Sequence, residues 1–289
     1  MKTTIHICAL FALFIASPLA DAIQPARSAR TTMEMPVIAH IKHALGSYAD
    51  LIVGDPRFVV DPSIFRQRTN AGNHGAHHPQ RLDYDYVFND WSRARGKGFL
   101  ETDKGAFDRE EELFGVPREF VNGILNIETQ WGRNLGEWPV VTTLYTIAVL
   151  KPDFQKQGWA EQQLIAFLAI CKKNNVDPFS VNGSRTGAFG YPQFEPTSYP
   201  ICAVHCRTES GPPDLFDEAD AICSIGNYLH RAGWGKSEAS HRKALHGYIR
   251  DPFYAAAVLD YADLLAGRPL KHPRYQFFHP QGVERAVAK

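Results

Sequence analysis

The chain lacks the charge imbalance and the long apolar runs that mark several specialised protein classes. Acidic and basic residues number 31 each, so the formal net charge is zero. This balance gives no sign of the basic surface that nucleic acids or anionic membranes attract. Charged residues make up 21% and apolar residues 44%, which excludes a disordered composition. With 289 residues, the chain is long enough for one large domain or two small ones.

Cysteine is also scarce. The chain has five, and Cys8 lies in an N-terminal segment that we expect to be removed. An even number remains, which suits one or two disulfides in an oxidising compartment. The remaining cysteines are Cys171, Cys202, Cys206 and Cys223. Cys202 and Cys206 flank His205 and could instead bind a metal, but no second ligand pair lies nearby at zinc spacing. We therefore predict no metal and no cofactor.

The first residues have the pattern of a secretory signal. Lys2 precedes the apolar run Ile7–Ala16, and the tripeptide ADA at 20–22 fits the small-x-small cleavage pattern. The mature chain is therefore expected to begin at Ile23 and to be a soluble protein of the periplasm or the cell exterior. The alternative is an N-terminal anchor, although the run is too short to cross a bilayer comfortably. No later segment is a transmembrane candidate.

Apolar residues at helical spacing recur along most of the chain, whereas strand patterns are few and short. The spacing predicts helices over 37–53, 117–131 and 159–175, and a long C-terminal helix with a break near Pro252. We predict a mainly α fold with a small irregular or β-containing loop region. The expected organisation is a signal peptide at 1–22, an N-terminal helical extension and linker at 23–84, a helical domain at 85–267 and a tail at 268–289.

Glu128 draws attention because it lies among apolar positions. On the helix predicted at 117–131 it shares a face with Ile124 and Trp131, so it should project from the apolar side beside an indole. Burial raises the pKa of a carboxyl group, and an acid still protonated near neutral pH is what protonation of a glycosidic oxygen requires. The alternative is an ordinary surface or ion-paired glutamate, for example with Arg133, and periodicity alone favours that role.

A glycine-rich stretch, NGSRTGAFGYPQFEPTSYP at 182–200, is a second candidate for function. Gly183, Gly187 and Gly190 would let the backbone approach a ligand closely. Gln193 offers both a donor and an acceptor to a sugar amide or hydroxyl. The alternative is a connecting loop whose glycines only make turns.

A third candidate is the histidine group His74, His77 and His78, which suggests a metal-dependent peptidase. No carboxylate or cysteine accompanies these residues at ligand spacing, so an exposed loop is the favoured interpretation.

Three segments together resemble the lytic murein transglycosylase B family (glycoside hydrolase family 103). FGVPREFVNGILNIETQWGRNLG is similar to the segment around the catalytic acid of that family. NGSRTGAFGYPQFEPTSYP and DLFDEADAICSIGNYLHRAGW are similar to two later blocks, and all three follow in family order over about residues 85 to 265. The resemblance implies a lysozyme-like, mostly helical fold with a peptidoglycan groove. It places the catalytic acid/base at Glu128 and substrate contacts at Ser184, Tyr191, Gln193 and Tyr248.

The chain also departs from the family pattern. Ile249 stands where the family has an asparagine, which puts one hydrogen bond to the glycan in doubt. Some members have a calcium loop in the region that here contains Cys206, Thr208 and Ser210, none of which is an acidic ligand. We therefore predict no calcium there and expect a disulfide to replace the ion as a staple.

The function implied by the resemblance is that of an exported lytic transglycosylase. It would cleave the MurNAc-β-1,4-GlcNAc bond of peptidoglycan and leave a 1,6-anhydromuramyl end, using a single glutamate. A hydrolase usually needs two carboxylates, and we expect the other candidates, Glu137 and Glu195, to be ordinary side chains, Glu195 being solvated. The alternatives are a hydrolytic muramidase on the same fold and a non-catalytic peptidoglycan-binding protein. Peptidoglycan glycan strands are the expected partner, with no nucleic acid and no stable membrane span.

Overall fold

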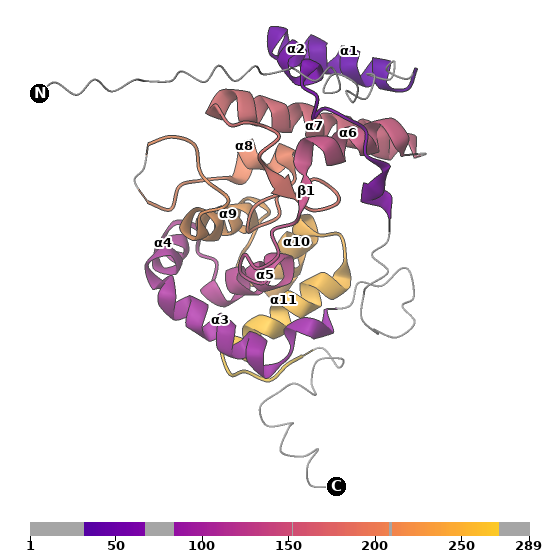
Figure 1. Cartoon of the computed structure of the whole chain (residues 1–289). Coiled ribbons are helices and arrows are strands. Elements are labelled where there is room, and N and C mark those ends of the chain that lie inside the picture. Colours follow the sequence, from indigo (N-terminus) through magenta and orange to yellow (C-terminus); the bar gives the residue numbers. More distant parts are fainter. Residues whose placement is uncertain (1–31, 67–83, 152, 208–209, 272–289) are drawn as a thin grey trace, which may run out of the picture.

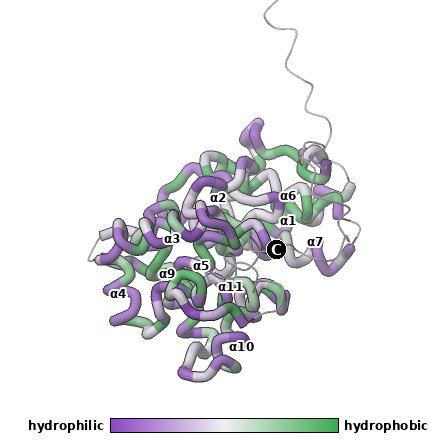
Figure 2. The backbone as a smooth tube through the Cα atoms, turned by 90° about the horizontal axis from the view of Figure 1, so that it is seen from below, coloured by the Kyte–Doolittle hydropathy of each residue, from purple (hydrophilic) through white to green (hydrophobic). Residues whose placement is uncertain are grey.

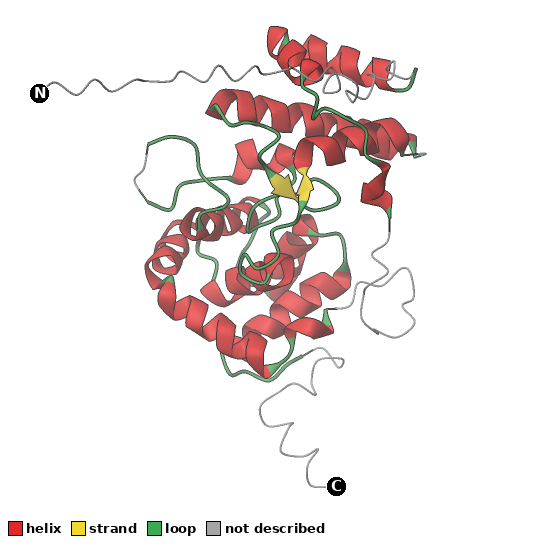
Figure 3. Ribbon diagram, in the orientation of Figure 1, coloured by secondary structure: helices red, strands yellow, loops and turns green. Residues whose placement is uncertain are grey.

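The structure is a computed structural model that describes residues 32–66, 84–151, 153–207 and 210–271. Helices make up most of these residues, as predicted, and one small sheet lies among them (Figure 3). Among the described helices, none is both long enough and apolar enough to cross a bilayer. The predicted signal at 1–22 and the three histidines at 74, 77 and 78 lie outside the described residues.

One group of helices packs together at the top of Figure 1. It consists of α1 (Glu34–Leu45), α2 (Ser47–Gly54), α6 (Val140–Leu150) and α7 (Phe154–Asn174), with the short η1 (Pro62–Phe65) beside them. A single hydrophobic core joins these helices, in which Ile41, Leu144 and Leu164 are fully buried. The helix predicted over 37–53 is divided at Gly46, whose φ of 61° ends α1 before α2 begins.

A second group surrounds α5 (Arg118–Thr129) in the lower half of Figure 1. Its other members are η2 (Asp85–Val87), α3 (Asp90–Thr102), α4 (Lys104–Phe114), α9 (Glu218–Arg231), α10 (Glu238–Tyr248) and α11 (Pro252–Leu265). Val121 and Ile124 of α5 are fully buried in the core of this group. Hydrophilic segments run along α4 and α10 at the rim of the molecule (Figure 2). The predicted break near Pro252 is confirmed, because α10 ends and α11 begins there.

The end of α5 is sharply defined by backbone conformation. Gln130, Trp131 and Gly132 all have positive φ, of 50°, 53° and 80°. The N–H of Gln130 donates to the carbonyl of Asn126, and the N–H of Trp131 donates to that of Leu125. Positive φ is uncommon for residues other than glycine, so the chain is strained directly after the last turn of α5. The helix therefore ends two residues before the predicted limit at 131.

A two-stranded antiparallel sheet lies between the two groups of helices (Figure 3). It pairs β1 (Trp138–Pro139) with β2 (Asn182–Gly183), and Trp138 lies opposite Gly183. After β2 the chain is largely irregular as far as η3 (Pro196–Ser198) and α8 (Tyr199–Cys202). This stretch matches the predicted β-containing loop region. The carbonyl of Tyr191 in this stretch accepts a hydrogen bond from the Thr129 hydroxyl, so the glycine-rich stretch lies next to the end of α5.

The N-terminal helices each bury one face in the core of the protein. The predicted boundary between an extension at 23–84 and a domain at 85–267 stays a prediction, but α1 and α2 share a hydrophobic core with α6 and α7. The helix α6 was not predicted from the sequence. Its residues, VVTTLYTIAVL, are almost all buried and carry no polar face, so they show no helical periodicity.

Candidate active site

Glu128 lies where two surface cavities meet. One cavity, of about 620 Å³, is lined by residues of the stretch 184–198 and by Trp159, Tyr248 and Ile249. The other, of about 590 Å³, is lined by residues 133–138 and Arg185. Both cavities are also lined by Glu128, Ser184 and Gln193. The two cavities therefore form one groove that passes the carboxyl group.

Among the described residues, one hydrogen bond holds the carboxyl group of Glu128. Tyr254 of α11 donates its hydroxyl to Oε1 at 2.7 Å. Burial raises the pKa of Glu128 to about 7, and this hydrogen bond opposes the rise because it favours the charged form. The predicted rise in pKa is thus confirmed. No ion pair to Glu128 occurs within the described residues, and Arg133 instead stacks on Trp91, with its guanidinium 4.9 Å from the ring centroid.

Tyrosines surround Glu128, in place of the expected indole. Trp131 is buried, and its Nε1 donates to Asn122. The rings of Tyr248 and Tyr254 stack with centroids 6.1 Å apart. Burial and the nearby Glu128 carboxylate raise the pKa of both phenols well above the usual value. Both hydroxyls therefore stay protonated, and that of Tyr254 is the one that donates to Glu128.

Tyr248 is a predicted substrate contact, and that role stays a prediction. It lines the larger cavity together with Glu128, and its hydroxyl donates to the carbonyl of Pro192 at 2.5 Å. Ile249 lines the same cavity and presents an aliphatic side chain in place of an amide. Its expected effect on glycan binding stays a prediction.

Ser184 and Gln193 reach the groove from the stretch after β2. The hydroxyl oxygen of Ser184 accepts hydrogen bonds from the N–H groups of Thr186 and Ala188. Gln193 has a φ of 49°, and its Nε2 donates to the carbonyls of Leu135 and Gly190. Both amide protons are thereby used, so Gln193 offers a ligand only the acceptor Oε1. The sequence had suggested a donor as well.

Tyr191 lies apart from the other predicted substrate contacts. Neither cavity beside Glu128 is lined by it. Its hydroxyl donates to Glu218 of α9 at 3.0 Å, and its carbonyl accepts from Thr129 of α5. A Cβ added to Gly132 would come within 2.4 Å of the Tyr191 ring. The geometry therefore suits a residue that fixes the end of α5, and the substrate contact stays a prediction.

The glycines of this stretch make room for protein atoms. A Cβ on Gly187 would meet the side chain of Leu144 at 2.6 Å, and a Cβ on Gly190 would meet Leu215 at 2.5 Å. Both glycines also have positive φ, of 81° and 76°. They are therefore needed for tight turns and close packing rather than for approach to a ligand.

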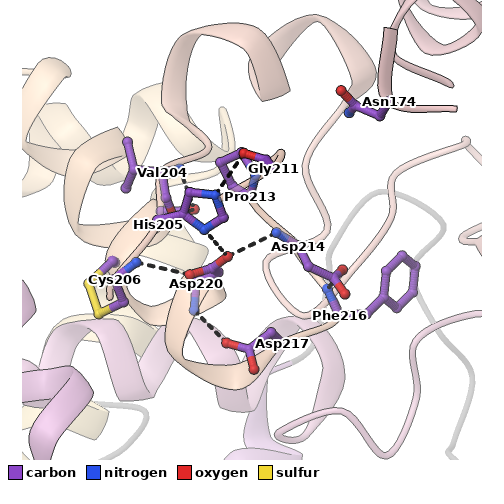
Figure 4. A network of polar contacts seen from close by, with 12 residues as sticks. Asn174, Val204, His205, Cys206, Gly211, Pro213, Asp214, Phe216, Asp217 and Asp220 are labelled. Atoms are coloured by element: carbon purple, nitrogen blue, oxygen red, sulfur yellow. Dashed lines mark hydrogen bonds and ion pairs between the residues drawn. A yellow bond between two sulfur atoms is a disulfide. The ribbon is translucent and has the colours of Figure 1, made fainter. Parts of the chain in front are cut away.

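The region around Cys206 is held by a disulfide and a polar network. Cys206 is bonded to Cys223, as the expectation of a disulfide staple requires, whereas Cys171 and Cys202 are free and buried. Figure 4 shows Asp220 at the centre of the network. Its carboxylate accepts hydrogen bonds from the N–H groups of Cys206 and Asp214, and contacts the ring of His205 at 3.0 Å. The cysteine–histidine metal site considered above does not form here, because the disulfide uses the Cys206 sulfur. No cluster of metal-ligating side chains occurs in the described part of the chain.

Several residues of the site were not predicted from the sequence. Tyr254 is the hydrogen-bond partner of Glu128. The sequence offered only one indirect sign of this role, namely that Tyr254 follows Tyr248 directly after the break between α10 and α11. Glu195 is exposed, as expected, but it lines the larger cavity. Its Oε2 accepts from Trp159 Nε1 at 3.3 Å and from Gln163 Nε2 at 3.4 Å. These long-range pairs leave no local pattern in the sequence.

Known proteins resemble this chain in sequence and in fold. The family description "Transglycosylase SLT domain" matches residues 63–263. Membrane-bound lytic murein transglycosylase B of Escherichia coli K12 is 34% identical over 143 residues, which are 50% of this chain and 39% of that protein. The chain thus spans well under half the length of this relative.

Two solved structures share the fold. Soluble lytic transglycosylase SltB1 from Pseudomonas aeruginosa superposes with a TM-score of 0.69 at 22% identity, covering 81% of this chain and 98% of that one. SltB3 from Pseudomonas aeruginosa, in complex with NAG-anhNAM-pentapeptide, superposes with a TM-score of 0.67 at 20% identity, covering 83% and 80%. Because the family description covers more than half of the sequence, the chain belongs to the transglycosylase SLT domain family.

Proposed function

We propose that the protein is an exported lytic transglycosylase that cleaves the MurNAc-β-1,4-GlcNAc bond of peptidoglycan and leaves 1,6-anhydromuramyl ends. The observation that carries this proposal is a glutamic acid with a pKa of about 7 at the centre of a continuous groove. Such a group is half protonated near neutral pH, so it can serve first as an acid and then as a base. The similarity to a lytic murein transglycosylase supports the choice of substrate.

In the first step Glu128 donates its proton to the glycosidic oxygen as the bond from that oxygen to the muramyl C1 breaks. The N-acetylglucosamine hydroxyl leaves, and positive charge develops at C1, where the muramyl acetamido group stabilises it. Tyr254 steadies the new Glu128 carboxylate, because its hydroxyl already donates to Oε1.

In the second step the Glu128 carboxylate takes the proton of the muramyl 6-hydroxyl. The oxygen attacks C1, the 1,6-anhydro bond forms, and Glu128 is again protonated. No water is consumed. Exclusion of water from the groove therefore decides between this ring closure and hydrolysis.

Three predicted residues have geometry that suits sugar binding. Ser184 and Gln193 line both halves of the groove, and Tyr248 lines one half beside Glu128. The free Oε1 of Gln193 suits a hydroxyl or amide N–H of the substrate. We propose that these side chains hold the sugars on either side of the bond that breaks.

A hydrolytic muramidase is the second candidate, because another carboxylate shares the cavity with Glu128. Glu195 could position a water molecule, as the second carboxylate of an inverting hydrolase does. Its Oε2 is already occupied by Trp159 and Gln163, which favours a structural or binding role.

Export is also part of the proposal. The sequence pattern of residues 1–22 is that of a secretory signal. The Cys206–Cys223 disulfide suits an oxidising compartment such as the periplasm.

The test is mass spectrometry of the products released from purified peptidoglycan by residues 23–289 and by the Glu128→Gln variant. We expect anhydromuramyl products from the wild type, and a rate lower by about a thousandfold from the variant, since the amide cannot transfer the proton. The variant should still bind peptidoglycan. Reducing-end products would favour the muramidase, and binding without release by either protein would contradict catalysis altogether.

A further inference from the structure

Glu195 presents a carboxylate to the larger cavity beside Glu128, and two side chains of α7 fix its position. Its Oε2 accepts hydrogen bonds from Trp159 Nε1 at 3.3 Å and from Gln163 Nε2 at 3.4 Å. The amide of Gln163 is buried and held by Thr197. Its Oε1 accepts from the Thr197 N–H at 2.9 Å, and its Nε2 donates to the Thr197 hydroxyl at 3.0 Å. Glu195 therefore needs little further ordering when it binds a ligand.

The second carboxyl oxygen of Glu195 is available to a ligand. Its Oε1 has no hydrogen-bond partner, and no cation pairs with Glu195, within the residues that the structure describes. Arg250 is the only cationic side chain among the described residues that line this cavity, and its guanidinium forms no ion pair with Glu195. Glu195 is also exposed, so a ligand in the cavity can reach Oε1. The groove thus offers an unpaired carboxylate at a fixed position.

Most of the strong side-chain donors of this cavity are already used by the protein. The hydroxyls of Tyr228 and Tyr248 donate to backbone carbonyls at 2.7 Å and 2.5 Å. Both amide protons of Gln193 go to carbonyls as well, and the side chain of Ile249 has none. The side-chain donors that remain are the guanidinium of Arg250 and the hydroxyls of serine and threonine. A ligand group that only donates therefore finds more open partners here than one that must accept.

The 2-substituent of an amino sugar decides what a glycan strand offers to this cavity. An acetamido group is neutral, and its carbonyl needs a donor if it is to be buried without cost. A free 2-amino group is an ammonium, which donates three hydrogen bonds and accepts none. Hydrogen bonds to ionised groups are roughly twice as strong as those between neutral groups. An ammonium beside Oε1 of Glu195 therefore gains an ion pair that an acetamido group cannot form.

We propose that Glu195 is a specificity-determining residue that favours strands with de-N-acetylated glucosamine, because its Oε1 pairs with the ammonium group of that sugar. The inference rests on the proposed function, since it takes a peptidoglycan strand as the ligand. The muramyl acetamido group keeps its role at C1, so the modification concerns the glucosamine alone. The reaction that supplies the favoured substrate is hydrolysis of the glucosamine acetamido bond by a deacetylase.

The experiment measures binding of glycan oligosaccharides without stem peptides, so that the sugar amine is the only ammonium in the ligand. Calorimetry on the Glu128→Gln background compares N-acetylated oligosaccharides with the same oligosaccharides after treatment with a glucosamine deacetylase. In this background Glu195 is the only acidic side chain among the described residues that line the larger cavity. The test variant adds Glu195→Gln, which keeps an acceptor oxygen for Trp159 and Gln163. The matched control adds Glu101→Gln, which removes an exposed carboxylate of α3 that lines neither cavity.

We expect the control to bind the deacetylated ligand about fivefold more tightly than the acetylated one. Glu195→Gln should weaken binding of the deacetylated ligand by about the same factor and leave the acetylated ligand unchanged. The ratio of the two Kd values, acetylated over deacetylated, should therefore fall to about one. Added salt should reduce this ratio in the control, because exposed charges are screened. Thermal unfolding of each protein verifies that it is folded.

Three other results would overturn the inference. A ratio near one in the control would show that the cavity does not distinguish the two sugars. An equal loss of affinity for both ligands in Glu195→Gln would show that Glu195 binds a hydroxyl or only holds its loop. A loss confined to acetylated strands that carry stems, measured in parallel, would assign the ammonium to the stem peptide. Failure of the proposed function has a different signature, namely that the protein with Glu128 intact releases no product from any of these strands.

Discussion

At the scale of single residues, two opposing effects set the protonation of Glu128. Removal from water raises its pKa, and the hydrogen bond from Tyr254 lowers it. The resulting value of about 7 suits a group that must give up a proton and take it back. In the proposed mechanism Tyr254 is therefore a positioning residue that acts on the reaction through Glu128.

Replacement of Tyr254 by phenylalanine tests this balance. The variant loses the donor that favours the carboxylate, so the pKa of Glu128 rises further and its protonated form persists to higher pH. We expect the alkaline limb of the pH profile of kcat/KM to move upward by about one pH unit. The control is Tyr86→Phe, whose hydroxyl donates to the carbonyl of Ile127 and not to the carboxyl group. A limb that stayed in place, or moved to lower pH, would show that Tyr254 does not tune Glu128.

The sequence could predict features of the site that depend on neighbouring residues, but not contacts between residues far apart in the chain. Local periodicity places Glu128 on the apolar side of a helix, but periodicity alone favoured an ordinary surface or ion-paired glutamate, and only the resemblance to a family favoured a catalytic acid. The role of Tyr254 could not be predicted, because it is 126 residues away in the chain. Gln193 was recognised as polar, but the use of both its amide protons by backbone carbonyls depends on the folded stretch around it.

At the scale of secondary-structure elements, α4 and α9 are packed around a buried acid. Glu110 of α4 is fully buried, and neither of its carboxyl oxygens has a hydrogen-bond partner among the described residues. Gly226 of α9 lies against it, since an added Cβ would come within 2.2 Å of Glu110 Oε1. Burial raises the pKa of Glu110 to about 9. The two helices are therefore in contact through a neutral carboxylic acid at physiological pH.

This acid makes the stability of the helix pair depend on pH. The pKa of Glu110 is higher in the folded than in the unfolded chain, so its contribution is most favourable below about pH 4.5 and is lost as the pH rises toward 9. At pH 7 the loss is about 3 kcal/mol. Glu110→Met should therefore gain stability relative to wild type as the pH increases from 4.5 to 8, measured by urea unfolding. Glu112→Met, on the exposed face of the same helix, is the control and should show no such trend. Parallel pH dependence of wild type and Glu110→Met would mean that Glu110 does not change its protonation on folding.

Prediction of the elements succeeded where one face of a helix is polar and failed where none is. The break between α10 and α11 follows from the proline at 252 and was predicted, whereas the helix predicted over 37–53 is divided at Gly46, which was not predicted. The helix α6 is buried on nearly all sides and rich in β-branched residues, so neither its period nor its composition distinguishes it from a strand. Its helical state is a consequence of packing against α7 and α1.

At the scale of the whole molecule, two hydrophobic cores meet at the groove. The core around α5 holds Glu128, and the core around α6 and α7 includes Phe189 and Phe194 of the stretch that carries Ser184 and Gln193. Glu128 and the residues proposed to bind sugar thus depend on different cores. Each core holds one set of groove residues in place. Loss of either core should therefore displace those residues and abolish activity.

The N-terminal helices α1 and α2 complete the core around α6 and α7, so their removal should destabilise the whole protein. α1 and α2 bury Val37, Ile41 and Ile52 against α6 and α7, and Glu34 accepts a hydrogen bond from Tyr145 at 2.8 Å. Burial of the apolar side chains of these two helices contributes roughly 10 kcal/mol before entropic costs, which is as large as the net stability of many domains. We expect residues 55–289 to lose cooperative thermal unfolding and transglycosylase activity, while residues 23–289 retain both. If residues 55–289 instead unfolded at the same temperature and kept their activity, α1 and α2 would be an independent extension, as the sequence boundary at 84 predicts.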